Sequence, residues 1–335
     1  MRAGKSAAAA AAPDLLFLRL SPKIVTQPAS TAPSATVSVV LCTYNGAAFL
    51  RAQLDSIRQQ TYPLHEVLAF DDGSTDATLD LLDDYAEQWP LLKVHRNPVN
   101  LGFNRNFEQA LRAATGDVLA ISDQDDIWMP EKVAKMMAVW KPECPVIYCD
   151  SMRFKGEPPA VPAKSHINAF FEGTDARQLL FANTVSGHAL MLRRPFLDKV
   201  LPFPEGIFYD WWTAFVAADN GGVCLLNEPL VLHRIHDKNA SGHEETSRSE
   251  VILYLRKDVM RHMKVFKDAP QVSERVRAFA RMFYEAYQRR EEKGGRWRLF
   301  RLILQHLETY FYYRRRKGAH KLRLVKYAYY YAFTD

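Results

Sequence analysis

The sequence predicts an α/β fold in which a mostly parallel sheet carries helices on both of its faces. Strand-like runs alternate with helical patterns between residues 36 and 140, and each strand-like run ends in polar residues. This alternation is typical of parallel sheets. Apolar residues make up 48% of the 335 residues, enough for a large buried core.

Four apolar or β-branched runs are predicted strands in the first half of the chain: 36–42, 66–70, 91–95 and 117–122. Helical spacing of apolar residues follows the first three of these runs, as in Leu50, Leu54 and Ile57 after the first. Beyond residue 140, the predicted strands are 145–150, 186–194 and 222–226, the predicted helix is 209–218, and 155–165 is a predicted loop.

Composition divides the chain into three segments. Residues 1–35, rich in Ala, Ser, Thr and Pro, are predicted to be a disordered leader. Residues 36–245 are predicted to form the α/β domain, with halves at 36–140 and 141–245. Residues 246–335 are predicted to be a helical, basic extension, because residues 281–335 hold 14 Lys and Arg against 5 Asp and Glu. No apolar run reaches the ~18 residues that span a bilayer.

Acidic residues gather where the fourth predicted strand ends. The stretch ISDQDDIW, residues 121–128, places Asp123, Asp125 and Asp126 directly after it. Alternate residues at a strand end can present oxygens to one divalent cation, and such hard ligands favour Mg²⁺ or Mn²⁺. The same stretch is also compatible with a solvated acidic loop in which Asp126 caps the following helix.

Polar residues also end the first two predicted strands, at Tyr44-Asn45 and at Asp71-Asp72. Ligands of open α/β sheets bind at the carboxyl ends of strands, so these clusters are expected to share one crevice. Asp71-Asp72 is compatible with binding a nucleotide base or ribose and also with closing the turn DDGSTD. No G-x-G-x-x-G follows the first strand, which argues against a dinucleotide-dependent dehydrogenase.

Four stretches in order resemble family 2 inverting glycosyltransferases with the GT-A fold: VSVVLCTYNGAAFLRAQLDSIRQQTY, DDGSTDAT, NLGFNRNFEQAL and SDQDDIWMPEKV. This resemblance covers about residues 37–137 and implies a Rossmann-like GT-A sheet. The later stretches SGHALMLRR, FYDWW and EPLVLHRIHDKNASG resemble the bacterial rhamnosyltransferase branch of the family. They extend the resemblance to roughly residues 36–242.

The resemblance implies roles for matching positions. The residues implied to bind the nucleotide sugar are Thr43, Tyr44, Asn45, Asp72, Asp123 and Gly187. Among them, Tyr44 would contact the base or ribose, Asp72 the base, and Asp123 the ribose. The implied ligands of Mg²⁺ or Mn²⁺ are Asp123, Asp125 and His236.

Asp210 occupies the position of the family's general base, although the family often has Glu before this Asp and Tyr209 stands here. Asp210 is also compatible with a helix cap, His233 and His236 with core or loop histidines, and Trp211 and Trp212 with the core.

The function implied by the resemblance is metal-assisted, inverting transfer of a sugar to a hydroxyl group. The donor would be dTDP-L-rhamnose or a UDP-hexose, and the acceptor a cell-surface glycan or a lipid-linked sugar. Two alternatives are a nucleotidyltransferase, which usually has a glycine-rich basic loop after the first strand, and a non-catalytic scaffold that binds nucleotide sugars.

The basic extension suggests where the protein acts. Trp297, Phe300, Leu304 and Leu307 share one predicted helical face, and Arg314 begins the basic run 314–317. Tyrosines and cations suit an anionic membrane surface. A cytoplasmic protein, peripheral on the inner face of a bacterial membrane, is therefore expected. The alternative is that this face packs on the domain. No nucleic-acid partner is expected, because residues 1–280 are mildly acidic.

Overall fold

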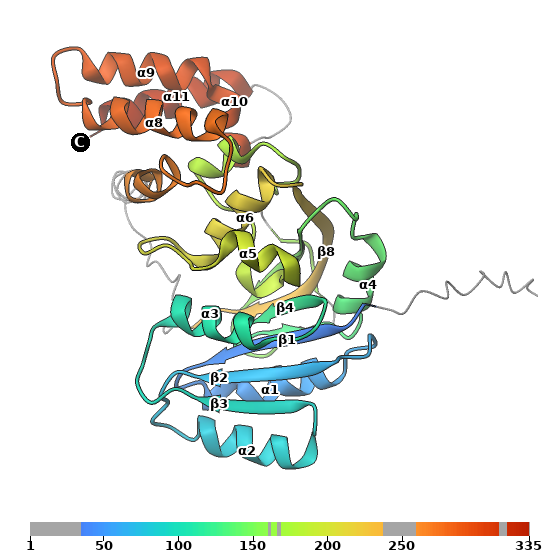
Figure 1. The fold of residues 1–335 in the computed structure, drawn as a ribbon. Helices are drawn as coiled ribbons and strands as arrows, with labels where there is room; N and C mark the ends of the chain where they lie inside the picture. Colours follow the sequence, from blue (N-terminus) through green and yellow to red (C-terminus); the bar gives the residue numbers. More distant parts are fainter. Residues whose placement is uncertain (1–34, 160–161, 166–168, 237–258, 315–319, 335) are drawn as a thin grey trace, which may run out of the picture. The chain divides into compact units, whose positions relative to one another are not determined.

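The computed structural model describes residues 35–159, 162–165, 169–236, 259–314 and 320–334, which belong to one compact unit. Residues 1–34, nearly all of the predicted leader, and residues 246–258 of the predicted extension lie outside the described residues. The described part contains a mixed α/β core, followed in the chain by helices (Figure 1).

The strands of the described residues form one sheet in the order β3-β2-β1-β4-β7-β6-β8-β5. Their bounds are β1 Val37–Thr43, β2 Glu66–Asp71, β3 Leu92–Arg96, β4 Val118–Ser122, β5 Ile127–Trp128, β6 Val146–Phe154, β7 Leu190–Arg193 and β8 Val223–Arg234. Strands β1 to β4 are parallel, β7 and β5 run antiparallel to their neighbours, and β6 pairs with β8 in parallel. The predicted mostly parallel sheet is confirmed.

The helices of the core connect successive strands. Their bounds are α1 Ala47–Arg58, α2 Thr78–Gln88, α3 Phe103–Ala113, α4 Lys132–Val139, α5 Leu197–Val200 and α6 Tyr209–Ala218. Short 3₁₀ segments are η1 Ala176–Leu180, η2 Gly187–Ala189 and η3 Arg194–Phe196. The C-terminal helices are α8 Glu274–Gln288, α9 Gly295–Gln305, α10 Leu307–Tyr310 and α11 His320–Phe333, with η4 at Tyr312–Arg314.

The alternation of side chains along the strands divides the core into two layers. On one face of the sheet, Val40 and Ile121 pack with Phe107 of α3 and Phe215 of α6. Val39 and other side chains of the opposite face pack with α1, α2 and α4. Because successive strand residues point to opposite faces, short apolar strands supply both layers. Helices on both faces of the sheet are thereby confirmed.

Four strands differ from the sequence prediction: β5 was not predicted, β6 ends at Phe154 instead of residue 150, and the bounds of β7 and β8 also differ. The ladder of β8 continues to Arg234, well beyond residue 226, because a β-bulge opposite Asp150 accommodates Pro229. Proline lacks an N–H and normally ends a central strand, which is why the sequence pattern stopped early. Strand β7 is shorter than predicted, since residues 187–189 form the 3₁₀ turn η2.

The C-terminal helices pack on the core through η1 and the segment that follows it. Phe181 stacks on Tyr310 with ring centroids 4.1 Å apart, and the Tyr312 hydroxyl donates to the carbonyl oxygen of Ala182 at 3.0 Å. No helix in the described part of the chain is both long and apolar enough to cross a membrane.

Candidate functional site

The turn after β1 is held in a fixed shape by hydrogen bonds from neighbouring turns. Asn45 adopts a left-handed backbone conformation with φ of 49°, which asparagine tolerates better than most residues. Its backbone N–H donates to Ser74 Oγ at 2.8 Å, and its side-chain oxygen accepts from the Thr75 N–H at 2.8 Å. The turn at residues 44–46 is therefore fixed against the turn that follows β2.

Tyr44 in this turn presents its ring to solvent. Its backbone N–H donates to Gln124 Oε1 at 2.8 Å, and Gln124 Nε2 donates back to the Tyr44 carbonyl at 3.0 Å. The side chain itself is 49% exposed. A backbone fixed in this way leaves the ring free to stack on a planar ligand group.

Both carboxylates that end β2 are buried and accept several hydrogen bonds. Asp71 accepts from the Thr43 hydroxyl at 2.8 Å and from the Ser74 N–H at 2.8 Å, so Thr43 serves the turn. Asp72 accepts from Asn97 Nδ2 at 2.8 Å and from the backbone N–H groups of residues 101 and 102, each at 2.9 Å. Asp72 thereby organises the loop before α3.

The loop after β4 presents Asp123 and Asp125 on its partly exposed side. Asp125 Oδ2 lies 2.8 Å from His236 Nε2. The two residues are 111 positions apart in the chain, and the fold brings them into contact. The two proposed metal ligands Asp125 and His236 are thus brought into direct contact.

Strand β8 positions His236. The imidazole stacks on Phe49 of α1 with centroids 4.5 Å apart. Just before it, Arg234 donates from Nε to the Asp125 carbonyl at 3.1 Å and from its backbone N–H to Asp126 Oδ1 at 3.1 Å. The end of β8 is therefore joined to the acidic loop by backbone as well as side-chain contacts.

Behind the acidic loop lies a buried group of ionisable side chains. Asp126, Lys132 and His188 are almost completely shielded from solvent. The Lys132 ammonium lies 3.3 Å from the ring centroid of Trp128 and donates to the His188 carbonyl at 3.2 Å. Asp126 is therefore no exposed helix cap, and α4 begins only at Lys132.

Burial shifts the pKa values of this group toward the neutral forms. Burial raises the pKa of Asp126, and the nearby Asp123 and Asp125 raise it further. Burial lowers the pKa of Lys132 to about 7 and lowers that of His188 well below its usual range. In low-dielectric surroundings a charge costs free energy unless an opposite charge is near, and here Lys132 and Asp126 lie near enough to interact.

Asp210 begins α6 and faces the same region. Its carboxylate accepts from the Trp211 N–H at 2.7 Å and also from the backbone N–H of Gly187. A Cβ at Gly187 would lie 2.3 Å from the Tyr209 hydroxyl, so the close approach of η2 to α6 requires glycine. Gly187 therefore lies against Tyr209 and Asp210.

Two carboxylates in this region have raised pKa values. Burial, and then the negative charges of Asp125 and Asp210, raise the pKa of Asp123 to about 7. Burial raises the pKa of Asp210 to about 6, although the backbone N–H groups that donate to its carboxylate favour the ionised form. Burial raises the pKa of the Cys42 thiol, and the nearby carboxylates of Asp123 and Asp72 raise it further. These interactions bring the ends of β1, β2, β4 and α6 into one acidic site.

Two sets of side chains could hold a divalent cation. Asp123, Asp126 and His188 offer ligand atoms within 4.8 Å of one another. Asp125 and His236 form the other set, with Asp123 next to them in the loop. The first set is buried beside Lys132, whose charged form would repel a cation. The partly exposed Asp125 and His236 are better suited to an ion that must also contact a substrate.

Several site residues escaped the sequence analysis. Lys132 resembled an exposed helical lysine, and Gln124 lies between two acidic residues without a motif of its own. The sequence offered one signal for His188, which is its position next to the candidate residue Gly187 in the stretch SGHALMLRR. Arg234 lies in β8 beyond the predicted end of that strand.

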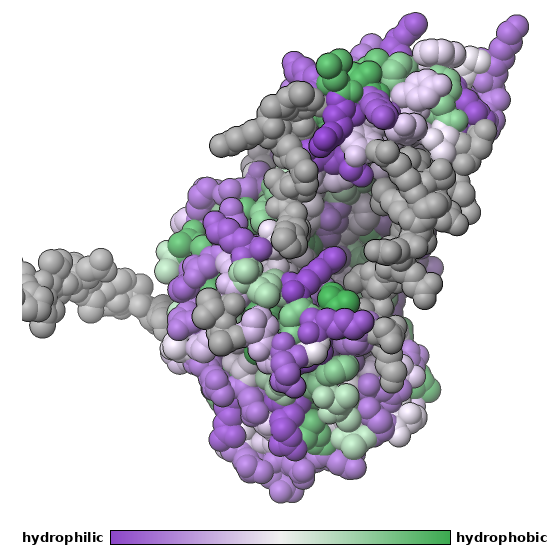
Figure 2. Space-filling view, turned by 180° about the vertical axis from the view of Figure 1, so that it is seen from behind, coloured by the Kyte–Doolittle hydropathy of each residue, from purple (hydrophilic) through white to green (hydrophobic). Residues whose placement is uncertain are grey.

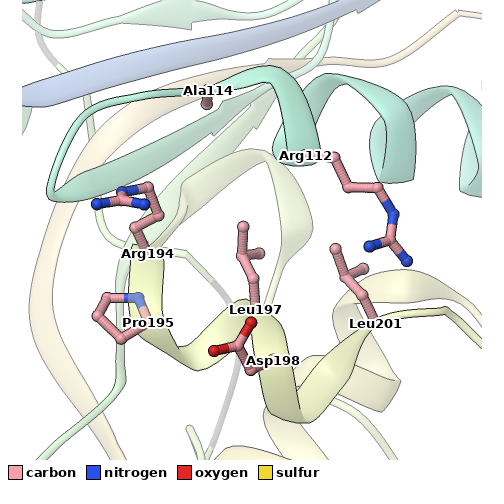
Figure 3. Close-up of a pocket in the computed structure, with 7 residues that line it drawn as sticks. All are labelled: Arg112, Ala114, Arg194, Pro195, Leu197, Asp198 and Leu201. Carbon is pink, nitrogen blue, oxygen red and sulfur yellow. The ribbon is translucent and has the colours of Figure 1, made fainter.

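A cavity of about 480 Å³ lies away from this site, between the end of α3 and α5 (Figure 3). Its lining includes Arg112, Arg194 and Asp198. It contains no residue of the acidic site, so these side chains offer matched positions for control substitutions.

Comparison with known proteins shows what part of the chain is similar to. Residues 38–201 match the family model "Glycosyl transferase family 2". An uncharacterized glycosyltransferase of Nostoc sp. is 28% identical over 222 residues, covering 64% of this chain and 69% of that protein. The putative glycosyltransferase EpsH of Bacillus subtilis is 27% identical over 217 residues, covering 60% of this chain and 61% of that protein. The chain thus spans about three fifths of EpsH.

Solved structures support the fold assignment. TarS of S. aureus, residues 1–349 in complex with UDP-GlcNAc, matches with a TM-score of 0.54 and 18% identity over 89% of each chain. The mannosyltransferase PcManGT of Pyrobaculum calidifontis, in complex with GDP-Man and Mn²⁺, has a TM-score of 0.54 and 19% identity, covering 90% of this chain and 87% of that one. The predicted GT-A-type fold is confirmed.

We expect Asp126 and Lys132 to stabilise the domain jointly. Asp126→Asn and Lys132→Met should each lower the free energy of unfolding by ~1–3 kcal/mol, because each removes the electrostatic interaction between two buried groups, and Lys132→Met also removes the hydrogen bond to the His188 carbonyl. The double substitution should cost clearly less than the sum of the two. Urea unfolding of the four proteins measures this coupling, and strictly additive losses would show that the two groups do not interact.

Proposed function

We propose that this chain, whose residues 38–201 match the glycosyl transferase family 2 model, is an inverting glycosyltransferase with Asp210 as its general base. The supporting observation is the proximity of Asp210, a carboxylate with a pKa of about 6, to Asp123, which also lies near Asp125. At neutral pH such a carboxylate is mostly ionised and can accept a proton. The neighbouring acidic residues suit a divalent cation, and a bound cation can in turn attract a diphosphate.

The reaction is a single displacement. As the acceptor hydroxyl oxygen attacks the anomeric carbon, Asp210 takes the hydroxyl proton, and the bond from that carbon to the diphosphate oxygen breaks on the opposite face. Configuration at the anomeric carbon is inverted. The N–H groups of Trp211 and Gly187 fix the orientation of the Asp210 carboxylate throughout.

Mg²⁺ or Mn²⁺ is the expected cofactor, held by Asp125 and His236 with Asp123 beside them. Carboxylate oxygens are the ligands that these hard cations favour, and imidazole is compatible with Mn²⁺. When bound, the cation stabilises the negative charge that grows on the diphosphate leaving group. Without it, the crowding of Asp123, Asp125 and Asp210 would repel a diphosphate.

The nucleotide is assigned to the turns at the carboxyl ends of β1, β2 and β4. Tyr44 offers its exposed ring to the base or ribose, on a backbone that Asn45 and Gln124 hold in place. Asp72 accepts three hydrogen bonds within the protein, and an ionised carboxylate has about four acceptor sites, so one remains for a base N–H. Asp123 is assigned to the ribose, while Thr43 and Gly187 support these turns.

For the donor, dTDP-L-rhamnose is preferred and a UDP-hexose comes second, both on the motif resemblance of residues 186–242. The acceptor is a hydroxyl of a cell-surface glycan or of a lipid-linked sugar. Nucleotidyl transfer fits less well, because such enzymes usually have a basic glycine-rich loop after the first strand, and here the turn after β1 is CTYNG.

A donor panel tests the proposal. The protein is incubated with dTDP-L-rhamnose, UDP-hexoses and Mn²⁺, with simple glycoside acceptors, and the released nucleotide and the product's anomeric configuration are measured by NMR. We expect nucleoside diphosphate release and an inverted anomer. A retained anomer would contradict the mechanism, release of a sugar 1-phosphate would indicate nucleotidyl transfer, and binding without turnover would identify a scaffold.

We expect turnover to require a divalent cation that Asp125 and His236 bind. Chelation with EDTA should abolish turnover. Asp125→Ala should slow it greatly, because losing this ligand removes several kcal/mol of transition-state stabilisation. His236→Ala should raise the Mn²⁺ concentration required for half-maximal rate. Asp198→Ala, in the distant cavity, is the matched control and should change nothing. If Asp126→Asn shifts the Mn²⁺ requirement and His236→Ala does not, the cation lies in the buried set instead.

We expect Asp210 to set the acid limb of the rate profile. Since the carboxylate is active only when ionised and its pKa is about 6, kcat/KM should fall as the pH drops below about 6. Asp210→Asn should lower kcat at least ~10²-fold and abolish this limb, with little change in donor affinity. Asp198→Asn is the control. Normal turnover by Asp210→Asn would mean that Asp210 is structural and another group is the base.

A further inference from the structure

The C-terminal helices carry an apolar surface that faces solvent. Leu322, Val325, Tyr329 and Phe333 recur at i, i+3, i+7 and i+11 on α11, on the side opposite its buried residues Leu324 and Ala328. Leu322 is 81% exposed and Tyr329 is 48% exposed. A helix that exposes an apolar stripe while burying another one is unusual in a soluble domain.

Helix α9 extends this surface. Trp297 is 61% exposed, and its ring lies 4.8 Å from that of Phe333 and 5.9 Å from that of Phe300. Phe300 in turn lies 6.1 Å from Tyr329, which stacks on Phe333 at 4.6 Å. The rings therefore form a continuous cluster across α9 and α11. Together with Leu322 and Val325 of the exposed stripe, these rings form what we call the α9–α11 patch, which consists of Trp297, Phe300, Leu322, Val325, Tyr329 and Phe333.

Exposed cations adjoin the patch. On α11, Lys321, Arg323 and Lys326 are exposed, and on α9 so is Arg301. Among the described residues, none of these four side chains forms a salt bridge. Figure 2 shows hydrophobic and hydrophilic side chains close together on the C-terminal helices. A surface of this kind can make apolar and electrostatic contacts simultaneously.

A groove beside the patch adds to this positive charge. A cavity of about 400 Å³ between α8 and α9 is lined by Arg289, Arg298 and Arg301, over an apolar floor that includes Met282 and Leu302. Glu285 also lines it, and Arg298 pairs with Glu292 at 3.3 Å. Guanidinium groups bind phosphate well, because their planar N–H donors match its oxygens.

We propose that the α9–α11 patch docks on an anionic lipid bilayer, with Trp297 and Leu322 in the interfacial region and the lipid phosphates at Arg301, Lys326 and the α8–α9 groove. Tryptophan and tyrosine suit this boundary because each combines an apolar ring with a polar group. A second copy of the chain fits less well, since a symmetric contact would bring the unpaired cations of two patches together. The inference goes beyond the proposed function and does not depend on it.

Vesicle flotation of the full-length protein tests the docking. We expect binding to vesicles of phosphatidylcholine mixed with phosphatidylglycerol, weakened by salt, and much less binding to phosphatidylcholine alone. The substitution pair Trp297→Ser with Leu322→Ser should weaken binding at least ~10-fold by removing inserted apolar area. Arg301→Glu with Lys326→Glu should weaken it at least ~10-fold on anionic vesicles, since each cation near an anionic surface contributes about 1 kcal/mol.

Matched substitutions elsewhere provide the controls. Val139→Ser removes a similarly exposed apolar side chain, and Arg58→Glu with Lys155→Glu makes the same change in charge on the core domain. Both controls should float like the unmodified chain, and circular dichroism should show that every variant is folded. Donor turnover in detergent-free solution should be unchanged in the patch variants, which separates failure of docking from failure of the enzyme.

Three outcomes would overturn the proposal. The first is no flotation with either kind of vesicle. The second is flotation that the patch variants leave unchanged. The third is a dimer in size-exclusion chromatography that Trp297→Ser with Leu322→Ser converts to a monomer, which would make the patch a contact between copies of the chain.

Discussion

The site depends on how the protein compensates the repulsion among carboxylates at one edge of the sheet. The carboxylates concerned are Asp71, Asp72, Asp123, Asp125, Asp126 and Asp210. Backbone N–H groups stabilise Asp71 and Asp72, His236 pairs with Asp125, and Lys132 lies near Asp126. Asp123 and Asp210 keep the pKa values of about 7 and about 6. Hydrogen bonds thus stabilise the ionised forms of Asp71 and Asp72, whereas Asp123, Asp126 and Asp210 keep raised pKa values, as is common at functional sites.

Much of the fold followed from local patterns. The strands β1 to β4 lie within one residue of their predicted bounds, and α6 has the predicted bounds 209–218, because period-2 and period-3.6 patterns record which residues are buried. The extension of β8 through Pro229 could not be predicted, since a bulge depends on the partner strand β6 and leaves no local signal. The mostly parallel order followed from alternation, while the reversal of β7 depends on long-range pairing.

The candidate site was predictable where a motif marks it. Asp123 and Asp125 follow a strand, and their alternation already suggested a cation site. The contact between Asp125 and His236 joins residues 111 positions apart, and spacing along the chain cannot reveal such a contact. Lys132 shows the reverse difficulty, because lysine on a helix is usually exposed, and only the three-dimensional packing against Trp128 shows that it is buried.

Strand β8 has a consequence for how proteins of this architecture can vary in length. It pairs with β6 from Val223 to Arg234, pairs with β5 near its end, and delivers His236 directly after its last residue. Because strand side chains alternate, adding or removing one residue between the bulge and His236 would turn Arg234 to the opposite face and separate His236 from Asp125. The short stretch between the bulge and His236 therefore has a fixed length.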